Sequence, residues 1–170
     1  MLRGKEKDMK LFQGLFAKDS SIAIGAPAAG KLVSIKEVSD PTFSDEVLGK
    51  GAAIIPEDGK FYAPVEGTIS TIFPTGHAAA IIGSNGAEVL IHIGLDTVKL
   101  EGKHFTIHAT EGQKVKKGDL LLEADLDQIK AEGYDIITPV IICNSDEFST
   151  VEMMEQGQVI QGDDILKLQK

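Results

Sequence analysis

Two histidines, His77 and His92, lie on opposite sides of a turn signal, and imidazoles at such a spacing can perform chemistry together. Residues 83–86 read GSNG and separate two apolar runs, a pattern typical of a β-hairpin. A turn centred between Ser84 and Asn85 places His77 directly opposite His92 on the neighbouring strand, with Cβ atoms about 5 Å apart. The sequence therefore predicts a pair of facing imidazoles, provided that no bulge shifts the register.

Side-chain alternation along the two strands assigns both histidines to one face of the hairpin. The residues that share this face by parity are Phe73, Thr75, His77, Ala79, Leu90 and His92. The opposite parity of the second strand holds Val89, Ile91 and Ile93, which are expected to point into the core. Apolar side chains beside facing histidines on an outer face indicate a docking site for another molecule.

Facing imidazoles support two kinds of chemistry. They can bind zinc through ring nitrogens, with Asp96 close enough for a third ligand. Alternatively, one histidine attacks phosphorus and the other stabilises the transferring oxygens by hydrogen bonding. In this second case the carbonyl of Gly94 is within reach of the Nδ1–H of His92, which fixes the tautomer and makes Nε2 the attacking atom. Two unrelated strand histidines remain a third interpretation, and the nearby Thr75 and Asp96 favour a shared site.

The elements that must position these residues read as β-structure from residue 22 onward, because short apolar runs alternate with Gly, Pro and Asp about every ten residues. This spacing predicts an all-β antiparallel sandwich or barrel. Strands are expected at residues 31–35, 52–56, 61–63, 67–73, 78–82, 88–93, 104–107 and 119–124. Residues 125–132 (DLDQIKAE) predict a helical turn or two that Gly133 ends, and a further short turn fits residues 44–48.

The β-pattern also contains an internal echo. Residues 26–32 (APAAGKL) recur 37 positions later as residues 63–69 (APVEGTI), and residues 112–119 (GQKVKKGD) form a further unit of turn and strand. Two copies are too few for a tandem array, which needs three or more units. The echo therefore predicts similar β-corners in a pseudo-symmetric sandwich.

Composition excludes several classes of protein. A chain of 170 residues with 42% hydrophobic side chains suits one globular domain. A net charge of −9 without basic runs argues against nucleic-acid binding, which needs clustered Lys and Arg. The single cysteine, Cys143, can form neither an internal disulfide nor a Cys-rich metal site, and its apolar neighbours predict a core position. Neither a membrane-spanning run nor a secretion signal is visible, so a cytoplasmic protein is expected.

Residues 1–20 differ from the remainder, so a leader at 1–20 and one domain at 21–170 are expected. Apolar side chains near the start have helical spacing and lysines around them: Met9, Leu11, Phe12, Leu15 and Phe16. At most they would make a weak membrane contact, because so short a stripe buries little area. A mobile leader is the simpler expectation.

Five segments of the chain carry a family resemblance. They are APAAGKLVSIKEVSDPTFSDEVLGKG, FYAPVEGTISTIFPTGHA, EVLIHIGLDTVKLEGKHF, EGQKVKKGDLLLEADLDQI and the late TPVIICN. From about residue 22 to residue 170, the chain resembles the glucose-class enzyme IIA (EIIA) of the bacterial phosphoenolpyruvate:sugar phosphotransferase system. The resemblance implies a single-domain phosphocarrier with a β-sandwich fold and no cofactor or metal.

The resemblance also implies a role for each histidine. His92, in the HxGxD segment, is similar to the family's histidine that is phosphorylated at Nε2. His77, in the PTxHA segment, is similar to the one that contacts the phosphoryl group and stabilises the transition state, and Thr75 to the threonine that hydrogen-bonds it. The implied donor is the histidine-containing phosphocarrier protein HPr, and the implied acceptor is a cysteine of an EIIB domain of a sugar permease.

The same resemblance implies a docking surface. Asp40 and Asp96 match acidic positions that meet basic side chains of the partner, while Phe43 and Phe73 match an apolar ring and are both expected on the outside. Leu90 and Gly94 complete the expected partner contacts: Gly94, Leu90, Asp40, Asp96, Phe43 and Phe73. Two positions depart from the family pattern, since Leu90 stands where some relatives carry phenylalanine and Lys99 stands where an acidic residue suits a basic partner better.

Two other classes of protein compete with this interpretation. A lysostaphin-type zinc peptidase would use His92-x3-Asp96 as its first ligand pair, but it needs a His-x-His pair downstream, where the sequence has His104-x3-His108. A biotin- or lipoyl-carrier domain has turns similar to EGQKVKKGDLL, but such carriers are much shorter and Lys99 lacks the symmetric hairpin of a modified lysine. His104 and His108 are expected to be exposed or locally bonded.

Overall fold

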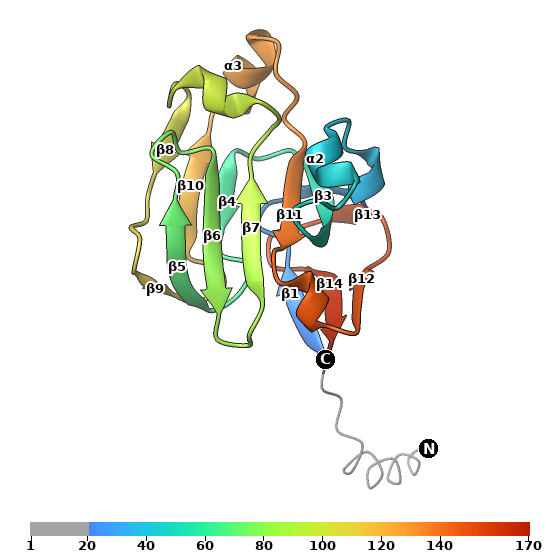
Figure 1. The fold of residues 1–170 in the computed structure, drawn as a ribbon. Coiled ribbons are helices and arrows are strands. Elements are labelled where there is room, and N and C mark those ends of the chain that lie inside the picture. Colours follow the sequence, from blue (N-terminus) through green and yellow to red (C-terminus); the bar gives the residue numbers. More distant parts are fainter. Residues whose placement is uncertain (1–20) are drawn as a thin grey trace, which may run out of the picture.

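The computed structural model describes residues 21–170 of the chain (Figure 1). The leader expected at 1–20, with its helical stripe and its membrane contact, lies outside the described residues. Within the described part, fourteen β-strands form three sheets in which every paired strand is antiparallel. The predicted all-β antiparallel fold is therefore confirmed.

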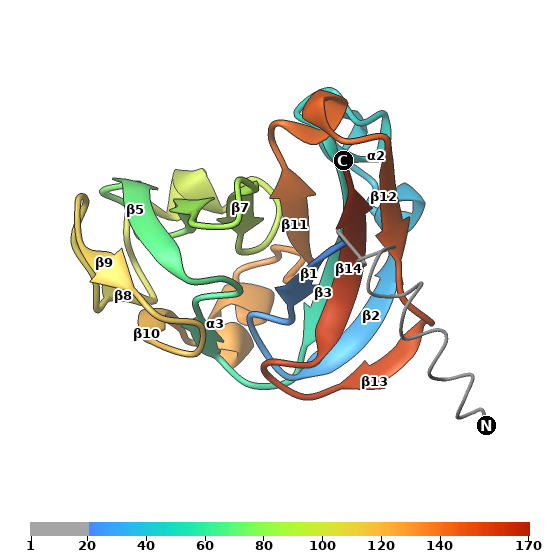
Figure 2. The ribbon, with the colours of Figure 1, turned by 90° about the horizontal axis from the view of Figure 1, so that it is seen from below.

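One large sheet and two small ones build the sandwich. The large sheet has the strand order β13 (Gly157–Val159), β2 (Gly30–Ser34), β3 (Lys50–Pro56), β11 (Thr138–Ile142), β7 (Glu88–His92), β6 (Ala78–Gly83), β5 (Gly67–Ile72) and β9 (Lys114–Val115). The first small sheet has the order β4 (Lys60–Tyr62), β10 (Leu120–Ala124), β8 (Phe105–Ile107). The second small sheet has the order β1 (Ile22–Gly25), β14 (Asp164–Gln169), β12 (Thr150–Met153). From below, β8, β9 and β10 lie at one end of the molecule and β12, β13 and β14 at the other (Figure 2).

All eight predicted strands are present, with ends that differ from the prediction by at most two residues. The sequence patterns did not single out β1, β9 or the last four strands. Two of these, β9 and β13, are only two and three residues long, too short for an alternation to be recognised. β11 is buried along its whole length and reads as a continuous apolar run, which does not distinguish a strand from a buried helix.

The two described α-helices are short, and each begins at an aspartate cap. Helix α3 (Leu126–Ala131) matches the predicted helical turns: the carboxylate of Asp125 accepts a hydrogen bond from the N–H of Gln128 (3.2 Å), and Gly133 follows the helix with a φ of +94°. Three 3-10 turns complete the set: η1 (Ile35–Glu37), η2 (Thr97–Leu100) and η3 (Ser145–Glu147). None of these helices is long and apolar enough to cross a lipid bilayer.

The short turn predicted at residues 44–48 is present, since the N–H of Glu46 donates to the carbonyl of Phe43 (3.0 Å) and the N–H of Gly49 donates to the carbonyl of Glu46 (3.2 Å). The prediction missed helix α2 (Pro41–Ser44), which precedes this turn and begins at Asp40, whose carboxylate accepts a hydrogen bond from the N–H of Thr42 (3.0 Å). Proline at the first helical position costs no hydrogen bond, because that N–H has no partner within the helix. Aspartate followed by proline is thus a helix-start signal that the prediction overlooked.

The echo in the sequence corresponds to two equivalent β-corners. The carbonyl of Ala26 accepts a hydrogen bond from the N–H of residue 162 (2.9 Å), and its N–H donates to the carbonyl of residue 163 (2.7 Å). Ala63 makes the same two bonds with residues 118 and 119 (2.9 and 2.8 Å). Each corner therefore holds one Gly-Asp turn, and the predicted pseudo-symmetry is present in the fold.

The two corners are also bonded to each other. The N–H of Gly25 donates to the carbonyl of Pro64 (3.0 Å), and the N–H of Tyr62 donates to the carbonyl of Pro27 (2.8 Å). These reciprocal bonds join the segment before β2 to the segment before β5. Strand pairing follows the same equivalence, since Gly30 of β2 pairs with β13 and Gly67 of β5 pairs with β9.

The register of the β6–β7 hairpin differs by one residue from the prediction. Its loop has three residues, 84–86, because the N–H of Gly83 donates to the carbonyl of Ala87 (2.8 Å) and the N–H of Gly86 donates to the carbonyl of Gly83 (3.0 Å). Gly86 has a φ of +97°, the left-handed conformation that the third residue of such a loop requires. The predicted two-residue turn is therefore wrong.

This register changes which residues face each other. Ala78, and not His77, lies opposite His92. Ala79 pairs with Ile91 and is fully buried in the core, so its predicted place on the outer face is wrong. Because strand side chains alternate with period two, a shift of one residue in the turn moves every residue of β6 to the other face.

Two clusters of buried apolar side chains form the core. The main cluster draws on all three sheets, whereas a second one lies beneath η1 and α2: Val33, Ile35, Val38, Phe43, Ala53, Leu95, Ile137 and Ile141. The second cluster contains residues from the β2–β3 connection and from the segment after β7. It therefore couples α2 to the end of the strand that carries His92.

Candidate active site

The two histidines come together by a different route from the one predicted. His92 is the last residue of β7, whereas His77 precedes β6 and belongs to the turn after β5. The N–H of Ile93 donates to the carbonyl of His77 (2.7 Å), which extends the ladder beyond the last strand pair. The ring centroids lie 5.0 Å apart with planes 81° from parallel. The imidazoles are therefore neighbours, as predicted, although they are not a cross-strand pair.

A tight turn at residues 73–77 delivers His77 to this position. The N–H of Gly76 donates to the carbonyl of Phe73 (2.7 Å), and Gly76 has a φ of +75°. A Cβ at position 76 would also lie 2.9 Å from the Cβ of Phe105. Both the left-handed backbone and the close approach of Phe105 require glycine here, and they fix the direction in which His77 leaves the turn.

Each imidazole uses its Nδ1 in a local hydrogen bond. The Nδ1 of His92 lies 2.8 Å from the carbonyl oxygen of Gly94, and because a carbonyl only accepts, this nitrogen carries the proton. The Nδ1 of His77 lies 2.6 Å from the hydroxyl of Thr75, which can donate or accept. Within residues 21–170 no hydrogen bond joins the Nε2 of either ring to a protein atom. Both Nε2 atoms are therefore free for a ligand.

Burial keeps both rings neutral at pH 7. Desolvation lowers the pKa of His77 to about 4, and the adjacent His92 adds to that shift. Desolvation also lowers the pKa of His92, while the Gly94 carbonyl and the carboxylates of Asp40 and Asp96 oppose the shift by favouring the charged ring. A neutral His92 with its proton on Nδ1 presents the lone pair of Nε2, which is the form that can attack an electrophile.

Two phenylalanines contact the histidine pair from different depths. Phe73 is 38% exposed and packs edge-on against His77, with centroids 5.2 Å apart. Phe43 packs against His92, with centroids 5.0 Å apart, but it is only 4% exposed. The prediction of an outer position is therefore wrong for Phe43, because α2 turns its ring into the second core cluster. Phe43 supports His92 from beneath, and Phe73 reaches solvent.

A depression of about 300 Å³ opens beside His92. Its lining combines apolar and acidic side chains: Asp40, Thr42, Phe43, Leu48, Phe73, Leu90, His92, Asp96 and Val98. The sequence did not single out Leu48 or Val98, which are 41% and 50% exposed. Leu48 lies in the loop after α2 and Val98 lies in η2, so neither belongs to a strand whose alternation could have indicated it. The depression gathers five of the predicted partner contacts around one ring.

Gly94, the remaining predicted partner contact, and Lys99, which departs from the family pattern, lie at the edges of this site. Gly94 is buried behind His92, with a φ of +76°, and its carbonyl orients that ring. Lys99 lines a second depression of about 600 Å³ next to the first, together with Asp40, Asp96 and Asp135. The acidic character of the surroundings is thus partly offset by one cation at the rim.

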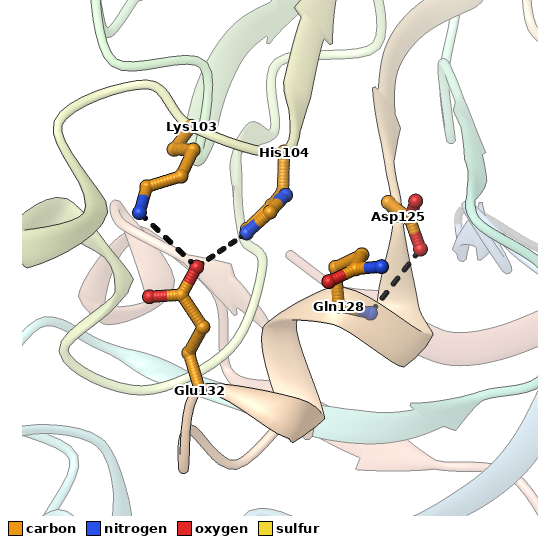
Figure 3. Close-up of polar contacts among 5 residues, drawn as sticks. All are labelled: Lys103, His104, Asp125, Gln128 and Glu132. Carbon is orange, nitrogen blue, oxygen red and sulfur yellow. Dashed lines mark hydrogen bonds and ion pairs between the residues drawn. The ribbon is translucent and has the colours of Figure 1, made fainter.

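His104 and His108 do not belong to the candidate site. The Nε2 of His104 lies 2.6 Å from a carboxylate oxygen of Glu132, which also contacts Lys103 (3.3 Å), as Figure 3 shows. The Nε2 of His108 lies 2.7 Å from a carboxylate oxygen of Glu123. The prediction of local bonding is therefore confirmed for both histidines.

Metal binding finds no ligand set in the described residues. Within the described part, no three His, Cys, Asp or Glu side chains gather closely enough to hold a metal ion. Asp96 does not complete a triad with His77 and His92. Cys143 follows the last residue of β11 and is exposed, so its predicted core position is wrong. The strand ends one residue earlier than the apolar run, which leaves the thiol outside the sheet.

Comparisons with known proteins agree with this geometry. Residues 22–148 match the family described as phosphoenolpyruvate-dependent sugar phosphotransferase system, EIIA 1. The chain is 39% identical over 157 residues to the PTS system glucose-specific EIIA component of Staphylococcus epidermidis, which covers 90% of this chain and 95% of that relative. A solved structure of the glucose permease IIA from Mycoplasma capricolum superposes with a TM-score of 0.80 at 38% identity, covering 86% of this chain and 95% of that one.

Higher identity occurs with part of a longer protein. The chain is 52% identical over 145 residues to the PTS system beta-glucoside-specific EIIBCA component of Bacillus subtilis. The match covers 85% of this chain and 24% of that protein. The chain thus spans about a quarter of the length of this relative.

Proposed function

Since the chain belongs to the EIIA 1 family of the phosphoenolpyruvate-dependent sugar phosphotransferase system, we propose a role for His92. Its Nε2 atom accepts a phosphoryl group from phospho-HPr and passes this group to a cysteine of an EIIB domain. The observation that carries this proposal is the hydrogen bond between the Nδ1 of His92 and the Gly94 carbonyl (2.8 Å). It occupies one ring nitrogen and leaves the lone pair of the other available.

The transfer needs no proton to change place. The lone pair of neutral His92 attacks the phosphorus of the donor's phosphohistidine, the donor P–N bond breaks, and the donor imidazole leaves with its own N–H. The new phosphoimidazole of His92 keeps its proton on Nδ1, where the Gly94 carbonyl stabilises the positive charge that develops. In the second step a thiolate of EIIB attacks phosphorus, the P–Nε2 bond breaks, and His92 returns to its neutral form.

His77 supports both steps as a neutral donor. Its pKa of about 4 leaves one N–H on the ring at pH 7. If the hydroxyl of Thr75 donates to Nδ1 across 2.6 Å, the proton resides on Nε2 and can be donated to a phosphoryl oxygen as charge develops there. A neutral donor binds the phosphoryl dianion less tightly than an imidazolium would, which suits a group that must leave again.

The surroundings of His92 fit a transient protein partner. Exposed apolar side chains provide contact area, and the carboxylates of Asp40 and Asp96 favour a partner with basic side chains around its own phosphohistidine. Charge of this kind speeds encounter more than it tightens binding, as a carrier with two successive partners requires. We further propose that these exchanges take place in the cytoplasm, where HPr and EIIB domains are expected.

Labelling with phosphoenolpyruvate tests the proposal. With the general phosphotransfer proteins, the wild-type chain should gain an acid-labile, base-stable phosphate, and His92→Ala should gain none. His108→Ala is the matched control, because it removes an exposed histidine outside the site, and it should label as the wild type does. A His92→Ala chain that labels normally would show that the phosphate lies elsewhere.

A second variant tests the supporting role of His77. His77→Gln should still accept the phosphoryl group, because the nucleophile is intact, but transfer to an EIIB domain should fall by about 10²-fold or more. Single-turnover transfer from the labelled protein measures this step directly. Transfer at the wild-type rate would assign the stabilising role to another group.

A further inference from the structure

The hydrogen bond that orients the ring of His92 comes from a carbonyl outside the strand pairs. The last pair between β6 and β7 joins Ala78 to His92, and the Gly94 carbonyl that bonds the ring belongs to the bend that follows. This bend contains two left-handed residues, Gly94 with a φ of +76° and Asp96 with a φ of +60°. Such a bend is not held by sheet hydrogen bonds, so other contacts must hold it.

The peptide unit between Gly94 and Leu95 is held at both of its polar atoms. Its carbonyl accepts from the Nδ1 of His92 (2.8 Å), and its N–H donates to the carbonyl of Asp135 (3.0 Å). The Asp135 backbone is itself restrained, since the side chain of Asp135 accepts from the N–H of Ile137 (2.9 Å). The plane of this peptide therefore depends on a segment that connects α3 to β11.

The preceding peptide unit, between Ile93 and Gly94, is held by Thr97. The hydroxyl of Thr97 donates to the carbonyl of Ile93 (2.5 Å), while the backbone N–H of Ile93 donates to the carbonyl of His77. Thr97 is fully buried, with no exposed surface, although its side chain is polar. A buried hydroxyl keeps its place only if its hydrogen bond is made.

Packing around Gly94 adds a further restraint. A Cβ at position 94 would lie 2.7 Å from the Cγ2 of Thr97 and 2.8 Å from the carbonyl oxygen of Asp135. The two peptides that flank Gly94 are thus enclosed between Thr97 and Asp135. The φ and ψ angles of Gly94 relate these two planes, so fixing both planes fixes the direction of the Gly94 carbonyl.

We propose that Thr97 is a positioning residue for phosphoryl transfer: its hydroxyl holds the Ile93 carbonyl, and this sets the Gly94 carbonyl that orients His92. The inference deepens the function proposed above and rests on it for its effect on catalysis. Its structural half, control of the His92 tautomer, can be measured without any phosphoryl group.

Imidazole NMR of the unphosphorylated, ¹⁵N-labelled full chain measures the tautomer at about pH 8, where imidazoles are neutral. In the wild type, His92 should be a single tautomer with its proton on Nδ1. Thr97→Val keeps the shape and removes the hydroxyl, so His92 should become a mixture of both tautomers. Thr97→Ser keeps the hydroxyl and should restore most of the wild-type spectrum.

Transfer kinetics supply a second readout. Thr97→Val should lower kcat for transfer from His92 roughly tenfold, with KM for the partner little changed, because the docking side chains are untouched. A matched control is Thr138→Val, which removes another fully buried hydroxyl that donates to the carbonyl of Ile136 (3.0 Å). It should leave the His92 tautomer unchanged.

The outcomes separate the two proposals. A Thr97→Val chain with the wild-type tautomer overturns the positioning role, whatever the labelling of His92. Equal tautomer mixing in Thr138→Val would also overturn it, because a general softening of the core would then be the cause. Equal mixing in Thr97→Ser would overturn it as well, because that variant keeps the hydroxyl and loses only the methyl contact. Failure of His92→Ala to abolish labelling would instead reject the proposed function and leave the tautomer result intact.

One measurement on the unaltered chain guards against variants that do not fold. A hydroxyl proton held in a buried hydrogen bond exchanges slowly with water, so the Thr97 hydroxyl should give a resolved NMR signal with a contact to the 93–97 bend. A Thr97 hydroxyl proton that exchanges as fast as those of exposed residues would overturn the proposal without any substitution.

Discussion

The hairpins β2–β3 and β5–β6 are two versions of one structural unit that differ in their connections. Each first strand begins with a glycine, Gly30 or Gly67, and each second strand contains Ala-Ala-Ile-Ile, at residues 52–55 and 79–82. Both units have a β-corner with the same pair of clamping hydrogen bonds. The connection, however, runs over residues 35–49 in the first unit and only 73–77 in the second.

The different lengths of the two connections explain how two similar hairpins build a single site. The long connection contributes α2, with Phe43 beneath His92 and Asp40 beside it. The short connection contributes Thr75 and His77. Both lead to the end of β7, so His92 contacts a phenylalanine from one unit and a second imidazole from the other. Strands of similar sequence provide the frame here, and loops of different length provide the side chains around His92.

The largest expected contrast lies between the phenylalanines of the two connections. Phe43→Ala should lower the free energy of unfolding by about 4 kcal/mol, because it leaves a cavity in the second core cluster. Phe73→Ala should lower it by less than about 1 kcal/mol, since its ring is 38% exposed, and should mainly raise KM for the partner. Urea unfolding of both variants measures the contrast. Equal losses would mean that both connections are structural.

The equivalence of the hairpins β2–β3 and β5–β6 can be tested at the glycine that begins each first strand. A Cβ would lie 2.2 Å from a backbone carbonyl oxygen at both Gly30 (the oxygen of Ile55) and Gly67 (the oxygen of Ile82). Gly30→Ala and Gly67→Ala should therefore each cost about 3 kcal/mol of stability, because backbone must move to relieve the clash. Gly112→Ala is a control with open space but a φ of +86°, so it should cost only the strain of a left-handed alanine, about 1 kcal/mol. A large loss in the free energy of unfolding at only one of Gly30 and Gly67 would contradict the equivalence of the two hairpins.

The short connection should also make stability depend on pH. His77 has a folded-state pKa of about 4 against an ordinary value of 6.5, so the unfolded chain binds more protons between these values. The contribution of neutral His77 is complete above pH 6.5 and is lost as the pH falls toward 4, amounting to about 2 kcal/mol between pH 7 and pH 4.5. Unfolding curves of wild type and His77→Gln across this range measure the difference. Parallel pH profiles would contradict the buried, neutral state.

The smallest expected effect concerns the charge of the long connection. Asp40→Asn keeps an N-cap side chain for α2, so stability should change by less than about 0.5 kcal/mol. The lost carboxylate should lower the pKa of His92 further and raise KM for a basic partner by a few-fold at low salt, with the difference vanishing at high salt. A salt-independent KM would show that Asp40 serves only as a helix cap.

Much of the fold could be predicted from local patterns. Period-two alternation and turn residues located eight strands, the repeated APxxG corners indicated the pseudo-symmetry, and Asp125 with Gly133 bounded a helix. These features depend on residues within a few positions of each other. Short or fully buried strands such as β9 and β11 escaped, because neither shows an alternation that could be recognised.

The site was predicted in its residues and not in its geometry. The types and spacing of Thr75, His77, His92 and Gly94 already indicated an imidazole pair with one fixed tautomer, since the Gly94 carbonyl lies only two residues from the ring it orients. The three-residue loop at 84–86, the burial of Phe43 and the enclosure of Thr97 emerged only in the folded chain. Register and burial depend on contacts between segments distant in sequence, and those contacts are decided by how the connections pack against the end of β7.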